Sequence, residues 1–126
     1  LKGSVTVEAD KKQFAAGETV TLTVKGKGLQ NVNALSMCLP YDATEMEYQG
    51  VEALAVKEMY NMTYDRLHTN GQKALYPTFV NLGDKKTLEG SDALFTIKLK
   101  AKRKVKFNLK ATDGILVDKN LNMQKF

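Results

Sequence analysis

The sequence holds one cysteine, one histidine and no tryptophan, and these shortages exclude several kinds of site. A single thiol, Cys38, cannot form an internal disulfide or build a multi-cysteine metal site. Zinc needs more His and Cys ligands than the chain contains. Without tryptophan, any stacking on sugar rings would depend on the five tyrosines. We therefore expect neither a disulfide nor a zinc site.

Long apolar runs and glycine-rich loops are also missing. No stretch approaches the roughly 20 apolar residues of a membrane-spanning helix, and no glycine run would cradle a phosphate between a strand and a helix. We expect no membrane insertion and no cofactor. The 126 residues have the length of one domain, and the chain begins at Leu1 rather than Met. The expectation is a single module, residues 1–126, excised from a larger multidomain protein.

The chain is basic, with 19 Lys and Arg against 14 Asp and Glu and a net charge of +5. A basic domain raises the question of nucleic acid. The lysines are spread along expected strands and turns, which is typical of a solvated surface. We expect no nucleic-acid partner, and a monomer.

Period-2 alternation of apolar and polar residues dominates the chain and is typical of half-buried strands. The clearest expected strands are 4–9, 19–25, 34–39, 74–81, 93–101 and 105–111, with shorter ones at 49–56 and near Leu116 and Met123. Pro77 indicates an edge or a bulge, and Asn70-Gly71 a hairpin turn. The alternation predicts an inward-facing core of Val7, Val20, Leu22, Leu35, Met37, Leu39, Phe95, Ile97, Leu99, Phe107 and Leu109.

One segment, 51–64, also has apolar residues at helical spacing, but it lacks a cap and is rich in β-branched and aromatic residues. Many short strands separated by turns favour an all-β sandwich or barrel instead. The fold class expected is therefore all-β.

Residues that could carry chemistry are few. Cys38 and His68 could form a nucleophile–base pair on paper, but Cys38 lies in the middle of an expected strand with nothing to activate it. Most acidic residues fall in expected turns, where Asp is common for structural reasons. Calcium binding around residues 113–120 stays open, although the spacing is not that of an EF-hand loop. We expect no catalytic residues and no enzyme activity.

Four segments follow a recurring order of strands and turns. A first strand leads to a turn of small, glycine and acidic residues and then to a strand of alternating Val and Leu. A third strand ends in a Tyr-Asp step, and a late strand carries a small–Leu–Phe–x–Ile pattern. The segments are 5–7 with 14–24 (VTV, FAAGETVTLTV), 33–42 (NALSMCLPYD), 46–48 (MEY) and 92–101 (DALFTIKLKA). Together these segments resemble cohesin-type modules. Residues 66–68 and 76–85 (RLH, YPTFVNLGDK) are similar in particular to cohesin-like modules attached to secreted glycoside hydrolases of gut bacteria.

The resemblance implies a flattened jelly-roll β-sandwich of about nine strands. It implies a secreted, periplasmic or cell-surface bacterial protein, with the chain as a non-catalytic accessory module of a glycoside hydrolase. Cohesins bind dockerins, short calcium-loaded helical modules, through one sheet face, so a dockerin-like module is the implied partner. Carbohydrate binding and a passive role as a spacer between domains are the open alternatives.

Outward-facing residues of two expected strands supply a candidate partner-binding site. On the strands at 34–39 and 105–111, the alternation leaves small and basic side chains pointing away from the core. Small residues beside lysines suit an acidic helix, because the lysines steer the encounter. If the two strands are neighbours, the site consists of Ser36, Cys38, Lys106, Asn108 and Lys110.

Overall fold

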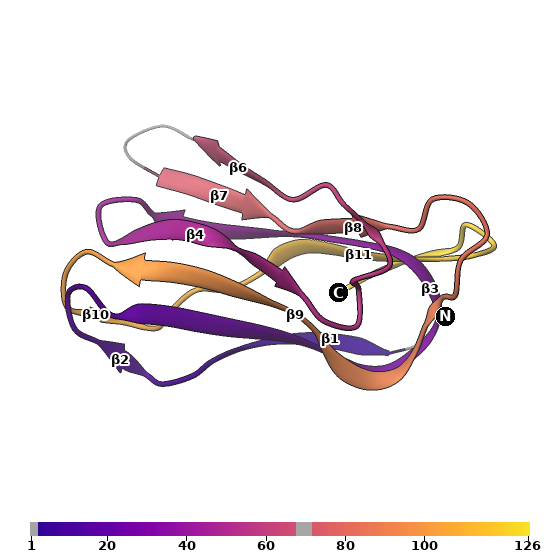
Figure 1. Ribbon diagram of the computed structural model, residues 1–126, viewed down its shortest axis with the longest axis horizontal. Coiled ribbons are helices and arrows are strands. Elements are labelled where there is room, and N and C mark those ends of the chain that lie inside the picture. The colour runs from indigo at the N-terminus through magenta and orange to yellow at the C-terminus, as the bar shows by residue number, and fades with distance from the viewer. Residues whose placement is uncertain (1–2, 68–71) are drawn as a thin grey trace.

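Twelve β-strands and no α-helix make up the described part of the computed structural model, residues 3–67 and 72–126 (Figure 1). In chain order they are β1 Ser4–Ala9, β2 Gln13–Phe14, β3 Thr19–Asp42, β4 Met46–Ala53, β5 Tyr60–Asn61, β6 Tyr64–Leu67, β7 Gln72–Tyr76, β8 Thr78–Val80, β9 Leu88–Ala101, β10 Val105–Lys106, β11 Thr112–Asp118 and β12 Met123–Lys125. The all-β prediction is confirmed. Residues 51–64 form the end of β4, a turn, β5 and the first residue of β6, not a helix.

The longest strand, β3, belongs to both layers of the fold. Its 24 residues bend where Gly28 and Asn31 adopt positive φ angles of 63° and 52°. Glycine and asparagine tolerate this left-handed conformation better than other residues. In Figure 1, β3 runs from left to right, turns at the right-hand end and returns. The two segments that the sequence predicts at 19–25 and 34–39 are therefore parts of one bent strand.

Two sheets pack face to face around the bend of β3. The first sheet has the order β1–β3–β9–β4 and uses the first half of β3. The second sheet places β11 and β12 on one side of the second half of β3, and β7 with β6, followed by β8 with β5, on the other. All these pairs are antiparallel. The result is the β-sandwich expected from the sequence.

The core between the sheets follows the predicted alternation. Eight of the eleven predicted positions are buried, from Val20 to Leu99. The other three, Val7, Phe107 and Leu109, are half-buried and pack against the core from its margin. A slip of one residue would have turned each strand inside out. The predicted faces are therefore correct.

The strand predicted at 105–111 is wrong over most of its length. Only β10 forms, and it pairs with β2 at the margin of the sandwich. The Phe107 N–H donates to the Lys12 carbonyl (2.9 Å), and the remaining residues, 108–111, are not in a strand. Alternation sets the side on which a side chain lies, but a strand also needs a partner backbone. Pro77 separates β7 from β8, as its missing N–H predicts. The predicted Asn70-Gly71 turn and His68 lie outside the described residues.

A tight turn joins β11 to β12 and is fixed by one carboxylate. Asp118 accepts hydrogen bonds from the N–H of Asn120 (2.8 Å), the N–H of Asn122 (2.9 Å) and the Asn122 side-chain amide (3.0 Å). The bonds from Asn122 are the main reason that the pKa of Asp118 lies below its usual value. The charged form of Asp118 therefore stabilises the folded state.

We expect an Asp118→Asn variant to show a smaller acid dependence of stability than the parent. Because the folded-state pKa is lowered, the contribution of Asp118 is complete above the unfolded pKa of about 3.9 and is lost as the pH falls through the folded-state value. Thermal unfolding at pH 2 to 7 should show the parent more stable at neutral pH and the two proteins converging in acid. A difference that stays constant down to pH 2 would contradict this role.

Candidate functional site

Side chains of the second sheet that point away from the core form rows across its strands. Paired residues of neighbouring strands point to the same side of a sheet. Leu35 and its partners Leu116 and Phe79 are fully buried, so this register faces the core. The residues on either side of Leu35, Ala34 and Ser36, therefore face outward.

Four such rows follow from the pairing and define what we call the apolar face. The first is Met123, Val117, Ala34, Val80 and Tyr60. The second is Lys125, Ile115, Ser36, Thr78 and Met62. The third is Thr112, Cys38, Tyr76 and Tyr64, and the fourth is Pro40, Ala74 and Arg66. No Asp or Glu belongs to these rows, and Lys125 and Arg66 lie at their ends.

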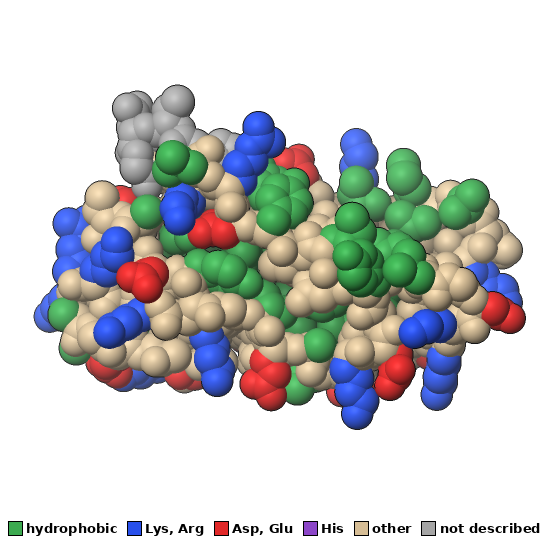
Figure 2. Space-filling view, turned by 45° about the horizontal axis from the view of Figure 1, so that its top comes forward, with side chains coloured by type: hydrophobic (Ala, Val, Ile, Leu, Met, Phe, Trp, Pro, Cys, Tyr) green, Lys and Arg blue, Asp and Glu red, His purple; other side chains and the backbone are tan. Residues whose placement is uncertain are grey.

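Large hydrophobic side chains are exposed on this face. Met123 is 69% exposed, Tyr60 54%, and Met62 and Tyr64 50% each. Figure 2 shows exposed hydrophobic side chains in a broken band between the grey segment and the right-hand end of the molecule. Clusters of this kind on a soluble domain mark interaction sites more often than chance exposure does.

The outer face of the first sheet has a different chemistry. Its outward positions include Thr21, which pairs with Lys98, and Thr23, which pairs with Glu8 on one side and Thr96 on the other. A salt bridge of 2.9 Å joins Lys25 to Glu8 on this side. A threonine, lysine and glutamate surface is typical of a solvated sheet face. The apolar face is therefore the candidate functional site.

A stacked pair of tyrosines covers part of the apolar face. The rings of Tyr64 and Tyr76 lie parallel within 11°, with centroids 4.8 Å apart. The hydrogen bond to the Cys38 thiol is the main cause of a raised pKa for Tyr76. Cys38 itself is only 7% exposed. The outward direction predicted for Cys38 is thus correct, but the residue lies beneath a side chain of the neighbouring strand.

We expect Cys38→Ala to cost about 1 kcal/mol of unfolding free energy, because a small buried contact beneath Tyr76 is lost. The effect exceeds that of an exposed position but falls well below that of a central core residue. Urea unfolding of both proteins measures it. A loss of several kcal/mol would show that Cys38 supports the sheet itself, and no loss would show that Tyr76 closes over the gap.

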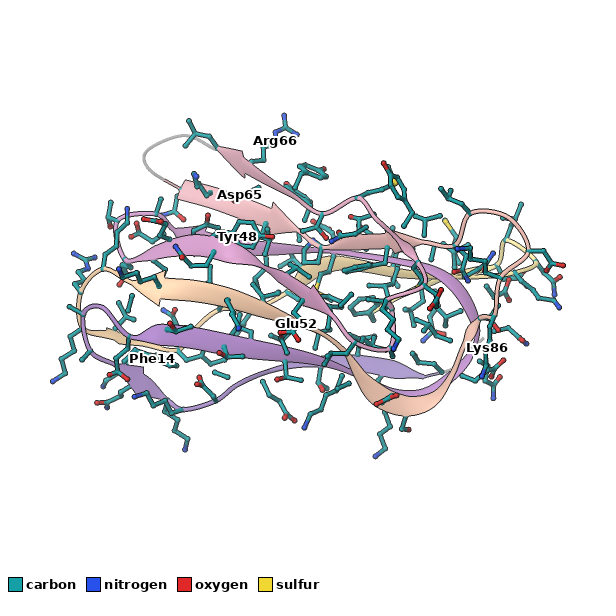
Figure 3. All side chains as sticks on the ribbon, viewed as in Figure 1. Phe14, Tyr48, Glu52, Asp65, Arg66 and Lys86 are labelled. Carbon is teal, nitrogen blue, oxygen red and sulfur yellow. The ribbon has the colours of Figure 1, made fainter. Side chains whose placement is uncertain are left out.

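The edge strand β6 is tied to the sandwich by a polar group on its inner side. Asp65 accepts a hydrogen bond from the Tyr41 hydroxyl (2.8 Å) and forms a salt bridge with Lys73 (3.2 Å). Burial and the bond to Asp65 raise the pKa of Tyr41. In Figure 3, Arg66 points away from the sandwich, whereas Asp65 lies on the side of β4 and Tyr48. This anchor holds the strand that presents Tyr64 and Arg66 on the apolar face.

The structure brings together only part of the site predicted from the sequence. Ser36 and Cys38 lie on the apolar face, and the Ser36 hydroxyl is 3.1 Å from that of Thr78. Lys106 lies on β10 and pairs with Gln13, while Asn108 and Lys110 are in the segment between β10 and β11. The second half of β3 pairs with β11, β7 and β8, so the assumption that it neighbours a strand at 105–111 is wrong.

Sequence reasoning missed the exposed rows because parts of β11 and β8 are apolar on both sides. Ile115-Leu116-Val117 and Phe79-Val80 have no polar residue at their outward positions. Such departures from alternation are the feature that could have located the face.

Metal binding finds no support in the part of the chain that the structure describes. There, no group of three His, Cys, Asp or Glu side chains lies close enough to hold an ion. In the region proposed for calcium, residues 113–120, the carboxylate of Asp118 is occupied by the backbone and side-chain donors of the turn. Among the described residues, no helix is long and apolar enough to span a bilayer.

A family model, described as the cohesin domain, matches residues 4–126. The chain belongs to the cohesin domain family. The resemblance noted in the sequence is confirmed, and the β-sandwich agrees with the fold of solved cohesin structures. No curated protein is similar enough in sequence to match the chain.

Solved cohesin structures share the fold at low identity. The cohesin module of a family 33 glycoside hydrolase from Clostridium perfringens is 14% identical over 98% of this chain and 88% of its own, with a TM-score of 0.72. A type II cohesin in complex with an X-dockerin from Acetivibrio cellulolyticus is 15% identical over 98% and 91% (TM-score 0.70). A type I cohesin–dockerin complex from Clostridium thermocellum contains a cohesin 11% identical over 95% and 90% (TM-score 0.68).

Proposed function

We propose that this cohesin domain binds a dockerin module through the apolar face. The observation that carries the proposal is the cluster of outward Tyr, Met, Val, Ile and Ala side chains on the second sheet. Similar cohesins from Acetivibrio cellulolyticus and Clostridium thermocellum are described in complex with dockerins. A sheet face that exposes apolar side chains suits a helix that presents an apolar side.

The charge of the face indicates the chemistry of its partner. Lys125 and Arg66 flank the apolar rows from opposite edges of the second sheet, and the rows contain no acidic residue. The domain as a whole carries +5. A dockerin with an apolar contact helix and acidic residues around it would be complementary and would be attracted over a distance. Lys106, Asn108 and Lys110, predicted as direct contacts, lie outside the face; the charges of the two lysines can still add to this long-range attraction, whereas the uncharged Asn108 cannot.

The module would then serve as a non-catalytic accessory domain of a secreted or cell-surface bacterial glycoside hydrolase. A cohesin of this kind is present in the family 33 enzyme of Clostridium perfringens. Docking would hold the enzyme that carries this domain beside the protein that carries the dockerin. The domain itself needs only an intact sheet surface for this task.

Calorimetric titration of the domain with a panel of calcium-loaded dockerin modules tests the proposal. We expect saturable one-to-one binding by at least one of them, and no heat with a dockerin whose calcium has been removed. Carbohydrate binding through Tyr60 and Tyr64 is the competing result, and a glycan array with the same domain detects it. Binding to glycans without binding to any dockerin would replace the proposed function.

A further inference from the structure

Lysines gather where the chain leaves β9 and enters β10. Residues 93–112 contain no Asp or Glu, whereas the stretch 98–110 contains Lys98, Lys100, Lys102, Arg103, Lys104, Lys106 and Lys110. A surface that serves only solubility mixes the two signs of charge. In the described parts of the chain, Arg103 alone of these residues forms a salt bridge, with Glu45 at 3.6 Å. The positive charge of the stretch is therefore largely uncompensated.

The β2–β10 ladder directs two of these lysines to one side. Phe14 and Val105 pair with each other and are buried, so the residues next to them in the two strands face outward. Lys106 pairs with Gln13. Lys104 lies two residues before Lys106, which is about 7 Å along an extended chain. The two ammonium groups thus stand side by side on the outer surface of the ladder.

A hollow of about 350 Å³ adjoins this pair, within the range of roughly 300–1,000 Å³ that is typical of small-molecule sites. It is lined by Gln13, Phe14, Ala15, Ala16, Glu18 and Lys104. The carboxylate of Glu18 is already engaged, because it accepts a hydrogen bond from the Ala15 N–H (2.7 Å) and forms a salt bridge with Lys11. The side chains of Lys104 and Gln13 are therefore the polar groups that a ligand would meet.

We infer that this hollow binds an acidic sugar, a carboxylated hexose of a polysaccharide chain. Lys104 and Lys106 supply the positive charge for carboxylates of the chain. The Gln13 amide can both donate to and accept from sugar hydroxyls. The methyl groups of Ala15 and Ala16 offer a small apolar surface to the C–H groups of the ring. Charge, amide and apolar surface together match an acidic sugar better than a simple anion.

A nucleic acid does not match the same surface. Single strands bind by stacking bases on exposed aromatic rings, and the aromatic residue of the hollow, Phe14, is only 1% exposed. The β2–β10 ladder also belongs to neither of the two large sheets. It lies at the lower left in Figure 1, and Lys and Arg side chains gather at that left-hand end in Figure 2. The site is therefore independent of the apolar face and of dockerin binding.

Calorimetric titration with an oligomer of galacturonic acid tests the inference, and the methyl ester of the same oligomer is the matched ligand. We expect saturable binding of the acid and little or none of the ester, which keeps the sugar but loses the charge. The Lys104→Gln/Lys106→Gln variant should bind the acid about tenfold or more weakly. The Lys27→Gln/Lys57→Gln variant removes the same charge from two other exposed positions and should bind as the parent does.

The Ala16→Ile variant tests the hollow itself, because it narrows the space without a change of charge. Ala16 is exposed, so the fold should be unaffected, and we expect a similar loss of affinity for the acid. No binding by the parent, or equal losses in the two double variants, would overturn the inference. Equally tight binding of heparin or single-stranded DNA, unaffected by Ala16→Ile, would show attraction to any polyanion and would overturn it too.

Discussion

An Ala34→Glu variant is expected to lose dockerin affinity by about a hundredfold or more while it unfolds at nearly the temperature of the parent. Ala34 lies in the middle of the first row, paired with Val117 on one side and Val80 on the other. In the free domain the new carboxylate reaches water, so its cost to folding is small. In the complex it would be trapped between two apolar surfaces and would repel an acidic partner.

Thr21→Glu is the control for this variant, because it places the same charge on the outer face of the first sheet. Thr21 pairs with Lys98 there, so the carboxylate is solvated and has a basic neighbour. Titration calorimetry and thermal unfolding of both variants give affinity and stability together. Unchanged binding by Ala34→Glu, or an equal loss in Thr21→Glu, would place the docking surface elsewhere.

Phe95→Ala is expected to cost about 3–5 kcal/mol of unfolding free energy, the largest effect on stability of any change considered. Phe95 is fully buried on β9 of the first sheet, and its ring lies 4.8 Å from that of Phe79 on β8 of the second sheet. The pair links the two layers at the centre of the core. Since a domain of this size is stable by roughly 5–15 kcal/mol, the variant should be close to unfolded at elevated temperature.

Phe107→Ala provides the comparison for Phe95. Both residues are predicted core positions, but Phe107 is half-buried at the margin, beyond the end of β10. Its loss should cost less than half as much, because the site is already open to water. Denaturant unfolding of the two variants decides the order. A Phe95 variant that loses less than about 1 kcal/mol would contradict the packing of the two sheets through this pair.

The inward faces of the strands could be predicted because alternation is a local property. Leu22, Leu35 and Ile97 are buried as the pattern requires, since a strand with one face in the core can be in only one register. The same local pattern continues through residues 107–111, where the structure has no strand. Pairing there depends on whether another backbone is within reach, and a single segment does not contain that information.

The functional face could be predicted only in part for a related reason. Ser36 and Cys38 were placed outward correctly, yet their neighbours come from β11, β8, β7 and β6, which are remote in sequence. The prediction that Lys106 belongs to the same site requires its strand to lie beside the second half of β3. The pairing of β10 with β2 excludes this arrangement. The order of strands across a sheet results from the whole chain, so the rows that combine Met123, Ala34 and Tyr60 emerge only in three dimensions.

Mapping of amide chemical shifts in the isotope-labelled domain, titrated with an unlabelled calcium-loaded dockerin, decides which sheet the dockerin covers. We expect the largest changes at Ala34, Ser36, Val80, Val117 and Met123, and small changes at Thr21, Thr23 and Lys98 on the outer face of the first sheet. Changes concentrated on the first sheet would show that the domain docks by the opposite side, and would rule out the apolar face as the docking surface.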